Sequence, residues 1–157
     1  MKIQLWSIGK PHESYIQEGI LDFTNRINKY FSASWLIIPT PKNAATLSEI
    51  DLKKVEAETI LQQITKDDFL ILLDERGKQF TSPNLASFLQ QRANDSNKKV
   101  IFLIGGAFGV HEQITKRANH IWSLSNLVFP HMLVRLILAE QIYRACTILR
   151  NEKYHHV

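Results

Sequence analysis

Two short, uninterrupted apolar segments constrain the fold of this chain more than any other feature. They occupy residues 69–73 and 100–104; charged residues flank the first and precede the second. An apolar run of this length without alternation is typical of a strand covered on both faces, as in a parallel sheet between layers of helices. The pattern therefore predicts an α/β protein, with residues 69–73 as a central strand.

Strand and helix patterns alternate along the rest of the chain. Further strands are predicted at residues 2–8, 34–38 and 121–124, and helices are predicted to begin near residues 14, 46, 82, 112 and 130. Such alternation indicates a mainly parallel sheet with helices on both faces. With 157 residues, 45% of them hydrophobic, the chain has apolar material for one core. We expect a single domain over residues 1–157.

Three of the expected helix starts rest on capping patterns. Each pair has the spacing either of a capping box or of an N-cap followed by proline. The pairs are Ser14 with Gln17, Thr46 with Glu49, and Ser82 with Pro83.

Charge and cysteine content indicate the setting in which the protein works. The formal net charge of +4 favours a polyanionic partner, although many proteins without one carry a similar charge. Cys146 is the single cysteine, which excludes an intramolecular disulfide and a cysteine-based zinc cage. Residues 1–10 do not resemble a signal peptide, and no apolar stretch approaches the roughly 20 residues of a membrane span. We expect a soluble, cytoplasmic protein that binds neither a membrane nor a metal.

The loops after the predicted strands contain the candidate binding site. In folds of this class ligands bind outside the carboxyl ends of the strands, here after Leu73, Ile104 and Leu124. The second of these loops has glycine at positions 105, 106 and 109, where the lack of a Cβ lets a ligand approach the backbone. It matches neither a phosphate-binding Walker loop nor a dinucleotide fingerprint, and a tight strand-to-helix turn would have the same composition.

The third loop belongs to an unusual segment, residues 122–135. Its mostly apolar run is interrupted by Ser123, Ser125 and Asn126, so it fits neither a strand nor a helix. We expect an ordered, buried loop. Buried backbone needs hydrogen-bond partners, and a purine ring offers several along its edge.

Four motifs, taken in order, resemble one known family. They are Leu-Leu-Asp-Glu-Arg-Gly-Lys from Leu72, Ile-Gly-Gly-Ala-Phe-Gly from Ile104, Ser-Leu-Ser with the following Pro-His, Val-Arg and Glu-Gln-Ile-Tyr-Arg-Ala from Ser123, and Tyr-His from Tyr154. Their order and spacing are similar to those of small SPOUT-superfamily methyltransferases, which modify N3 of a pseudouridine in large-subunit (23S) ribosomal RNA. The resemblance covers essentially the whole chain.

This resemblance implies a C-terminal trefoil knot, S-adenosyl-L-methionine as methyl donor, a homodimer, and ribosomal RNA in the assembled 70S ribosome as substrate. Carried over position by position, it assigns eight residues to the donor site, through apolar walls and backbone groups that read the adenine edge. They are Leu73, Gly105, Leu124, Ser125, Asn126, Leu127, Val128 and Phe129. The final helix independently favours a homodimer, because it carries more apolar residues than one sheet face can cover.

Methylation of a uracil-like N3 requires loss of its proton and stabilisation of the negative charge that develops. Arg135, one turn into the last helix, is our candidate cation. His131, at the start of that helix, is a candidate for contacting the base or relaying a proton, although a histidine at this position is more often a capping or surface residue. Glu140 and Arg144 have the spacing of a structural ion pair.

The tail combines an aromatic ring with cationic neighbours, at Tyr154, His155 and His156. Such a group is suited to stacking on a base and contacting phosphate, so we predict that these residues bind RNA. In relatives we expect arginine or lysine where this chain has His156, and this departure bears on the strength of the tail contacts.

Two other classes of function remain open at this stage. A noncatalytic RNA-binding protein with this fold would have the same basic charge. A flavodoxin-like nucleotide enzyme would explain the glycine loop, but no phosphate-anchoring lysine or acidic ribose reader stands at a suitable position. Within the methyltransferases, another uridine or a guanosine is also a possible target.

Overall fold

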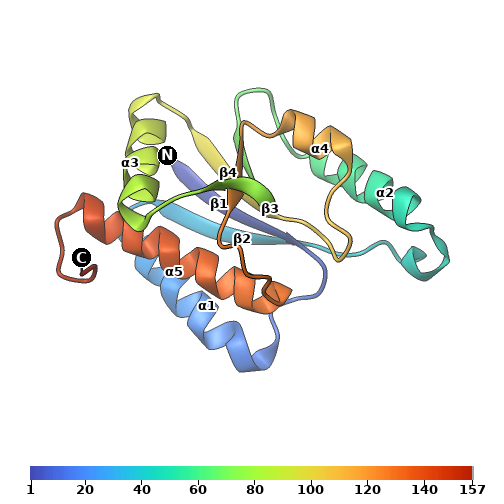
Figure 1. Ribbon diagram of the computed structural model, residues 1–157, viewed down its shortest axis with the longest axis horizontal. Helices are drawn as coiled ribbons and strands as arrows, with labels where there is room; N and C mark the ends of the chain where they lie inside the picture. The colour runs from blue at the N-terminus through green and yellow to red at the C-terminus, as the bar shows by residue number, and fades with distance from the viewer. Residues whose placement is uncertain (157) are drawn as a thin grey trace.

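The computed structural model describes residues 1–156 and shows one parallel sheet between two layers of helices (Figure 1). The strands are β1 (Lys2–Ile8), β2 (Ser32–Ile38), β3 (Phe69–Gln79), β4 (Lys99–Ile104) and β5 (His120–Ser123). The helices are α1 (Ser14–Ile27), α2 (Glu49–Leu61), α3 (Ser82–Asn94), α4 (Glu112–Arg117) and α5 (His131–Leu149), with a 3-10 turn at Ala44–Thr46. The predicted α/β class is confirmed.

The strands lie in the order β2-β1-β4-β3-β5, and all neighbours are parallel. Strand β4 therefore occupies the middle and β3 lies beside it. Leu70, Ile71 and Leu72 are at most 1% exposed, because helices cover β3 on both faces. The prediction of an interior strand at residues 69–73 is confirmed, although the central position belongs to β4.

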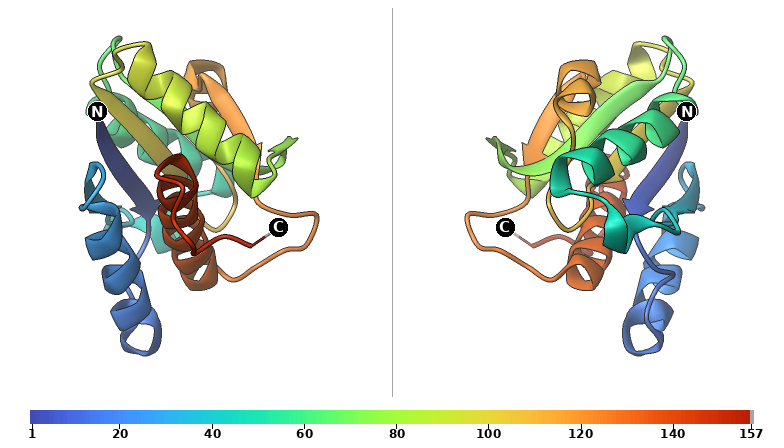
Figure 2. Two further views of the ribbon diagram at one scale, coloured as in Figure 1. Left: turned by 90° about the vertical axis from the view of Figure 1, so that its left-hand side faces the viewer. Right: turned by 90° about the vertical axis from the view of Figure 1, so that its right-hand side faces the viewer.

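Each face of the sheet has its own core. On one face α1, α3 and α5 pack against alternate residues of the strands, among them Leu5 and Phe102. On the other face α2 and α4 cover Trp6 and Leu103. The two views in Figure 2 show α5 lying between α1 and α3, with the tail folded back beside it. Because successive side chains of a strand point to opposite faces of the sheet, each interior strand contributes residues to both cores.

Two helix starts differ from the capping predictions because nearby groups compete for the predicted hydroxyls. The Thr46 hydroxyl donates to the Asn43 carbonyl (2.7 Å) within the 3-10 turn, and Ser48 caps α2 instead. The Ser82 hydroxyl donates to Gln141 of α5 (2.8 Å), and Thr81 caps α3. The predicted N-cap of α1 is also wrong.

In α1 the residue before Ser14 occupies the N-cap position, and its side chain makes no capping bond. Ser14 is therefore the first helical residue rather than the cap.

Strand β3 is longer than its apolar run. Residues 74–79 were expected to form a loop, but the strand continues to Gln79 after a shift in its pairing with β5 between Leu73 and Lys78. Gly77 permits this course, since a Cβ there would lie 2.5 Å from the Ile121 carbonyl oxygen. The shift creates a bulge that carries the residues after Leu73 out beyond the sheet end.

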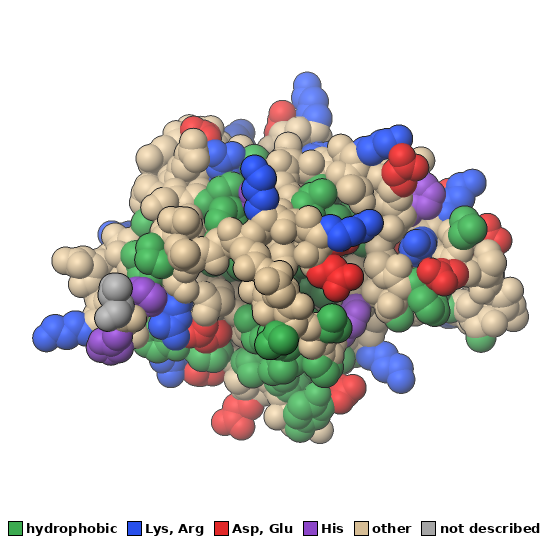
Figure 3. All heavy atoms as spheres, viewed as in Figure 1, with side chains coloured by type: hydrophobic (Ala, Val, Ile, Leu, Met, Phe, Trp, Pro, Cys, Tyr) green, Lys and Arg blue, Asp and Glu red, His purple; other side chains and the backbone are tan. Residues whose placement is uncertain are grey.

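Helix α5 is covered more completely than its composition predicts. Its central residues, such as Leu138 and Ile142, are fully buried against α1, α3 and the sheet. Apolar exposure is concentrated near its start, at Leu133 (37%) and, in the preceding loop, Leu127 (70%) and Val128 (82%). In the view of Figure 3, hydrophobic side chains gather around this part of the molecule.

Within the described residues, no helix is long and apolar enough to cross a membrane. The same residues contain no group of three His, Cys, Asp or Glu side chains able to hold a metal ion. The trefoil knot implied by the resemblance stays a prediction.

Candidate active site at the strand ends

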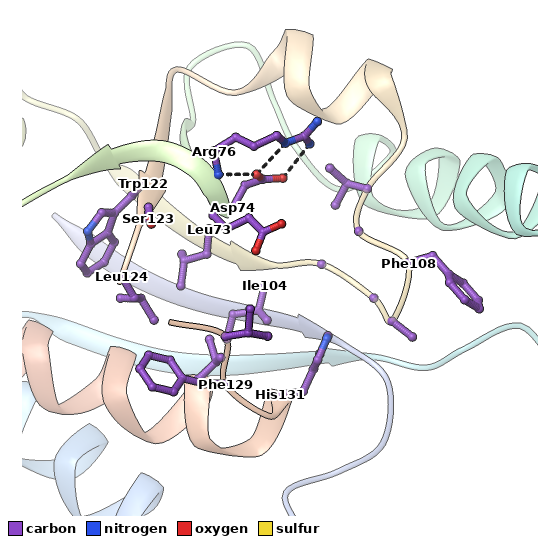
Figure 4. Close-up of a pocket in the computed structure, with 18 of the residues that line it drawn as sticks. Leu73, Asp74, Arg76, Ile104, Phe108, Trp122, Ser123, Leu124, Phe129 and His131 are labelled. Atoms are coloured by element: carbon purple, nitrogen blue, oxygen red, sulfur yellow. Dashed lines mark hydrogen bonds and ion pairs between the residues drawn. The ribbon is translucent and has the colours of Figure 1, made fainter. Parts of the chain in front are cut away.

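A cavity of about 890 Å³ opens where the carboxyl ends of β3, β4 and β5 meet. Its walls come from the bulge of β3, the loop after β4 and the segment between β5 and α5, as the close-up in Figure 4 shows. Seven of the eight residues assigned to the donor site line it: Leu73, Gly105, Leu124, Ser125, Leu127, Val128 and Phe129. The three loops selected from the sequence therefore do converge.

Asn126 is the assigned residue that does not line the cavity. Its side-chain carbonyl accepts a hydrogen bond from the Gln79 amide (2.7 Å), which ties this loop to the end of β3. Two serines fix the loop further: the Ser123 hydroxyl donates to the Ser125 carbonyl (3.0 Å), and the Ser125 hydroxyl accepts from the Leu127 amide (3.0 Å). The segment is ordered by its own polar side chains, as local side-chain bonds allow.

The expectation that this loop is buried holds for only part of it. Leu124 and Phe129 are partly buried, whereas Leu127 and Val128 project into solvent. Apolar spacing alone does not distinguish a residue facing the core from one facing a cavity mouth, because both are apolar. Leu124 and Phe129 thus line the inner part of the cavity, whereas Leu127 and Val128 line its solvent-exposed mouth.

The loop after β4 approaches the cavity with backbone rather than side chains. A Cβ on Gly105 would lie 2.8 Å from Val110 Cγ1, so this position has no room for a side chain. Gly109 has a φ of +81°, a conformation that L side chains rarely adopt. A tight turn is thus present here, closed by the hydrogen bond from the Gly109 amide to the Gly106 carbonyl (3.0 Å).

Charged residues on the bulge of β3 form the polar rim. Arg76 donates to Asp74 through Nε (2.9 Å) and Nη2 (2.8 Å), and hydrogen bonds from Arg76 hold the pKa of Asp74 below its usual value. Figure 4 shows this pair above Leu73. Both residues lie in the motif that begins at Leu72, but their pairing was not predictable from the sequence, because the strand was expected to end at Leu73.

His131 lies at the opposite wall, at the start of α5 (Figure 4). Burial, and secondly the charge of Arg135, lower its pKa from the ordinary histidine value. Its imidazole is therefore neutral near pH 7 and able to accept a proton. Of the two predicted catalytic side chains, His131 is the one that faces the cavity.

Arg135 lies behind this wall and does not line the cavity. It is 1% exposed; its Nε donates to the Ser7 hydroxyl (3.0 Å), and Nη1 donates to His12 Nδ1 (3.2 Å). Burial lowers its pKa, which the charge of Glu13 partly opposes, and it makes no ion pair within residues 1–156. An arginine stays protonated even so, and its positive charge contributes to the lowered pKa of His131 in the cavity wall.

Comparison with known proteins decides the family. Residues 1–155 match the family model described as a predicted SPOUT methyltransferase. The chain belongs to the SPOUT methyltransferase family. Two relatives named ribosomal RNA large subunit methyltransferase H are 45% identical in Cytophaga hutchinsonii and 43% identical in Parabacteroides distasonis. The alignments cover 99% of this chain in both cases, and 100% and 99% of the relatives.

A solved structure has a similar fold. It is a putative methylase family protein from Neisseria gonorrhoeae, with a TM-score of 0.52 and 12% identity, and the match covers 99% of this chain and 86% of that one. At this identity the likeness concerns the fold alone.

SPOUT methyltransferases use S-adenosylmethionine as methyl donor. The cavity fits such a molecule, because Leu73, Leu124 and Phe129 provide apolar surface for a purine while Gly105 exposes backbone. The paired Asp74 and Arg76 add a charged edge to this largely apolar cavity. The residues present are thus consistent with the family's donor.

The tail of this SPOUT protein folds back onto the later turns of α5. The Tyr154 hydroxyl donates to Glu140 (3.1 Å) and its ring packs edge-on against Tyr143 at 4.7 Å. Arg144 pairs with Glu140 (Nε to Oε1, 3.0 Å), which confirms the predicted ion pair. The Arg144 guanidinium also donates to His155 Nδ1 (3.4 Å).

His156 is exposed beyond these contacts. From His131 to Glu140 the helix rises by roughly 13 Å at 1.5 Å per residue, so the tail and the cavity lie apart within one protomer. The structure does not bring the two predicted sites together in a single chain.

Proposed function

We propose that this protein transfers a methyl group from S-adenosylmethionine to large-subunit ribosomal RNA. One observation carries the proposal: three strand-end loops enclose a single cavity in a SPOUT chain whose full-length relatives are named for this activity. The motif resemblance supports N3 of a pseudouridine as the acceptor and the assembled 70S ribosome, in the cytoplasm, as the setting.

S-adenosylmethionine, when bound, supplies an electrophilic methyl group on its sulfonium. The chain has to hold the donor in line with the acceptor nitrogen and exclude water, tasks for which the apolar walls at Leu124 and Phe129 are suited. Backbone groups of residues 124–129 would fix the adenine edge. These are positioning roles that need no proton transfer.

Loss of the N3 proton is the step for which the protein offers side chains. A neutral His131 in the cavity wall can accept this proton directly or through water. Negative charge then develops on the carbonyl groups beside N3, and the buried positive charge of Arg135 would stabilise it. Low exposure strengthens this effect, because little solvent screens the charge.

The RNA side of the proposal rests on the tail and on a second copy of the chain. Tyr154, His155 and His156 would contact the substrate by stacking and charge. Exposed Leu127 and Val128 beside the cavity mouth favour a homodimer formed at the start of α5, since apolar side chains this exposed are stabilised by a partner. Static light scattering at micromolar concentration should give twice the protomer mass; a stable monomer would contradict the dimer.

The decisive experiment is mass spectrometry of 23S ribosomal RNA from cells that lack this protein. We expect one missing methyl group on a pseudouridine, restored by the wild-type gene. An unchanged modification profile would reject the specific activity. Calorimetry with S-adenosylmethionine then separates the remaining possibilities, because a noncatalytic RNA-binding protein would not bind the donor.

A further inference from the structure

Glu56 is a buried carboxyl group without a partner. It lies on α2, is 7% exposed, and forms neither a hydrogen bond nor an ion pair with any residue in the described range 1–156. Burial raises its pKa. An uncompensated carboxyl in this position is costly for folding, and such groups are more common at functional sites than in cores.

This carboxyl group lies against Gly106, a residue of the cavity wall. A Cβ on Gly106 would lie 3.1 and 3.2 Å from the two Glu56 carboxyl oxygens, and Gly106 lines the cavity. Lys53, one turn earlier on α2, lines the cavity as well. The same side of α2 therefore places Lys53 in the cavity wall and the Glu56 carboxyl next to Gly106, just outside that wall.

The other carboxylates around the cavity are either ion-paired or exposed to solvent. Asp74 is paired with Arg76, and Glu112 is paired with Lys116 (2.8 Å). Glu75 is exposed to solvent, which screens its charge. Within the described residues, Glu56 is thus the buried carboxyl beside the cavity whose charge nothing balances.

A ligand that carries a positive charge would supply the missing balance. The methyl donor has an α-ammonium and an α-carboxylate at its amino-acid end, which complement Glu56 and Lys53 respectively. We infer that Glu56, reached across Gly106, recognises the ammonium group of the donor, with Lys53 facing the carboxylate. This inference rests on the proposed function, because it assigns one end of the same ligand.

Two analogues of the donor that have a neutral thioether in place of the sulfonium isolate this contact. S-adenosylhomocysteine keeps the amino-acid end, whereas 5′-methylthioadenosine has the same adenosine and thioether without it. In calorimetry, Glu56→Gln should weaken binding of S-adenosylhomocysteine by about tenfold, as expected for loss of an attractive charge near the ammonium group. Binding of 5′-methylthioadenosine should change by less than about twofold, since the adenosine contacts stay intact.

Glu58→Gln is the matched control, because Glu58 is exposed on the same helix. It should leave the affinity for both ligands unchanged. Thermal unfolding of Glu56→Gln should occur at or above the wild-type temperature, since the variant removes an unbalanced buried charge. A variant that is more stable and binds the donor more weakly would separate a ligand-binding role from a structural one.

The outcomes separate this inference from the function on which it rests. Equal weakening of both ligands by Glu56→Gln would make the residue structural and overturn the inference, as would no weakening of either. If wild-type protein binds both ligands equally well, the protein does not recognise the amino-acid end of the donor, and the proposed function is unaffected. Wild-type protein that binds neither would reject both.

Discussion

The cavity at the strand ends and the tail beyond α5 both carry residues suited to nucleotides, yet their polar groups are in opposite states. Within residues 1–156, Glu56 beside the cavity has no hydrogen-bond or ion-pair partner, and the buried Arg135 is hydrogen-bonded to Ser7 and His12 but makes no ion pair. In the tail, Tyr154 and His155 are hydrogen-bonded to Glu140 and Arg144. The first region keeps charges that no opposite charge balances, whereas the tail has paired its polar groups within the protein.

This difference has a thermodynamic consequence. A donor entering the cavity gains contacts without breaking any in the protein, because glycine backbone and apolar side chains form most of the wall. RNA binding by the tail must replace existing hydrogen bonds and ring contacts. We therefore expect donor binding to be independent of the tail, and the net contribution of the tail to RNA binding to be smaller than its direct contacts alone would give.

Replacing Arg135 by alanine should have the largest effect on the cavity side. We expect kcat to fall by roughly 10²–10³-fold on ribosomes, as for other groups that stabilise developing negative charge. Donor affinity should change little, because Arg135 does not line the cavity. Single-turnover kinetics with labelled donor would measure both; full turnover in Arg135→Ala would remove this residue from catalysis.

Gly105→Leu tests whether the cavity is preformed. The new side chain meets Val110, which lines the cavity, so the wall must rearrange, and we expect affinity for S-adenosylmethionine to fall by about a hundredfold. Gly19→Ala is a control on α1, where the added methyl meets only the flexible end of Leu136 (3.1 Å). Calorimetry on both variants checks this, and unchanged binding by Gly105→Leu would place the donor elsewhere.

Deleting the residues after Lys153 should have a smaller, selective effect. We expect kcat/KM for ribosomes to fall by roughly tenfold, in the range of one lost base-stacking contact. The affinity for the donor should stay at the wild-type value, because none of the described tail residues, 154–156, lines the cavity. Loss of donor binding in the truncated protein would contradict the separation of the two regions.

Much of the fold and of the cavity wall was predictable because it depends on local pattern. Apolar runs identified the interior strands, and the strand-end rule together with the family motifs selected seven residues that line the cavity. These features are set by periodicity and by residue type at a turn. They do not require knowledge of which distant segments meet.

The features that were missed depend on contacts between distant segments. The bulge of β3 exists because Gly77 passes close to Ile121, and Thr81 caps α3 because Gln141 engages Ser82. Lys53 reaches the cavity from α2, and Glu56 of the same helix lies against Gly106 of the cavity wall, far from any motif. Such relations appear only when the layers are assembled, so the charged end of the site was not predictable from the sequence.

The smallest effect we predict is a dependence of stability on pH that comes from the cavity side. Burial, with the charge of Arg135 second, lowers the pKa of both His12 and His131 below 6.5. Between each lowered value and 6.5 the unfolded chain binds more protons than the folded one, so stability rises with pH there and is lost as pH falls.

The unfolding temperature should therefore drop by a few degrees, about 2–4 °C for each kcal/mol lost in a chain of this size, as pH falls from 7 to below 6. His131→Gln should reduce this dependence, because glutamine does not titrate. His111→Gln is the control: His111 caps α4 through its Nδ1 atom and lies outside the Arg135 cluster. An equal pH dependence in wild type and His131→Gln would show that protonation of the cavity wall does not oppose folding.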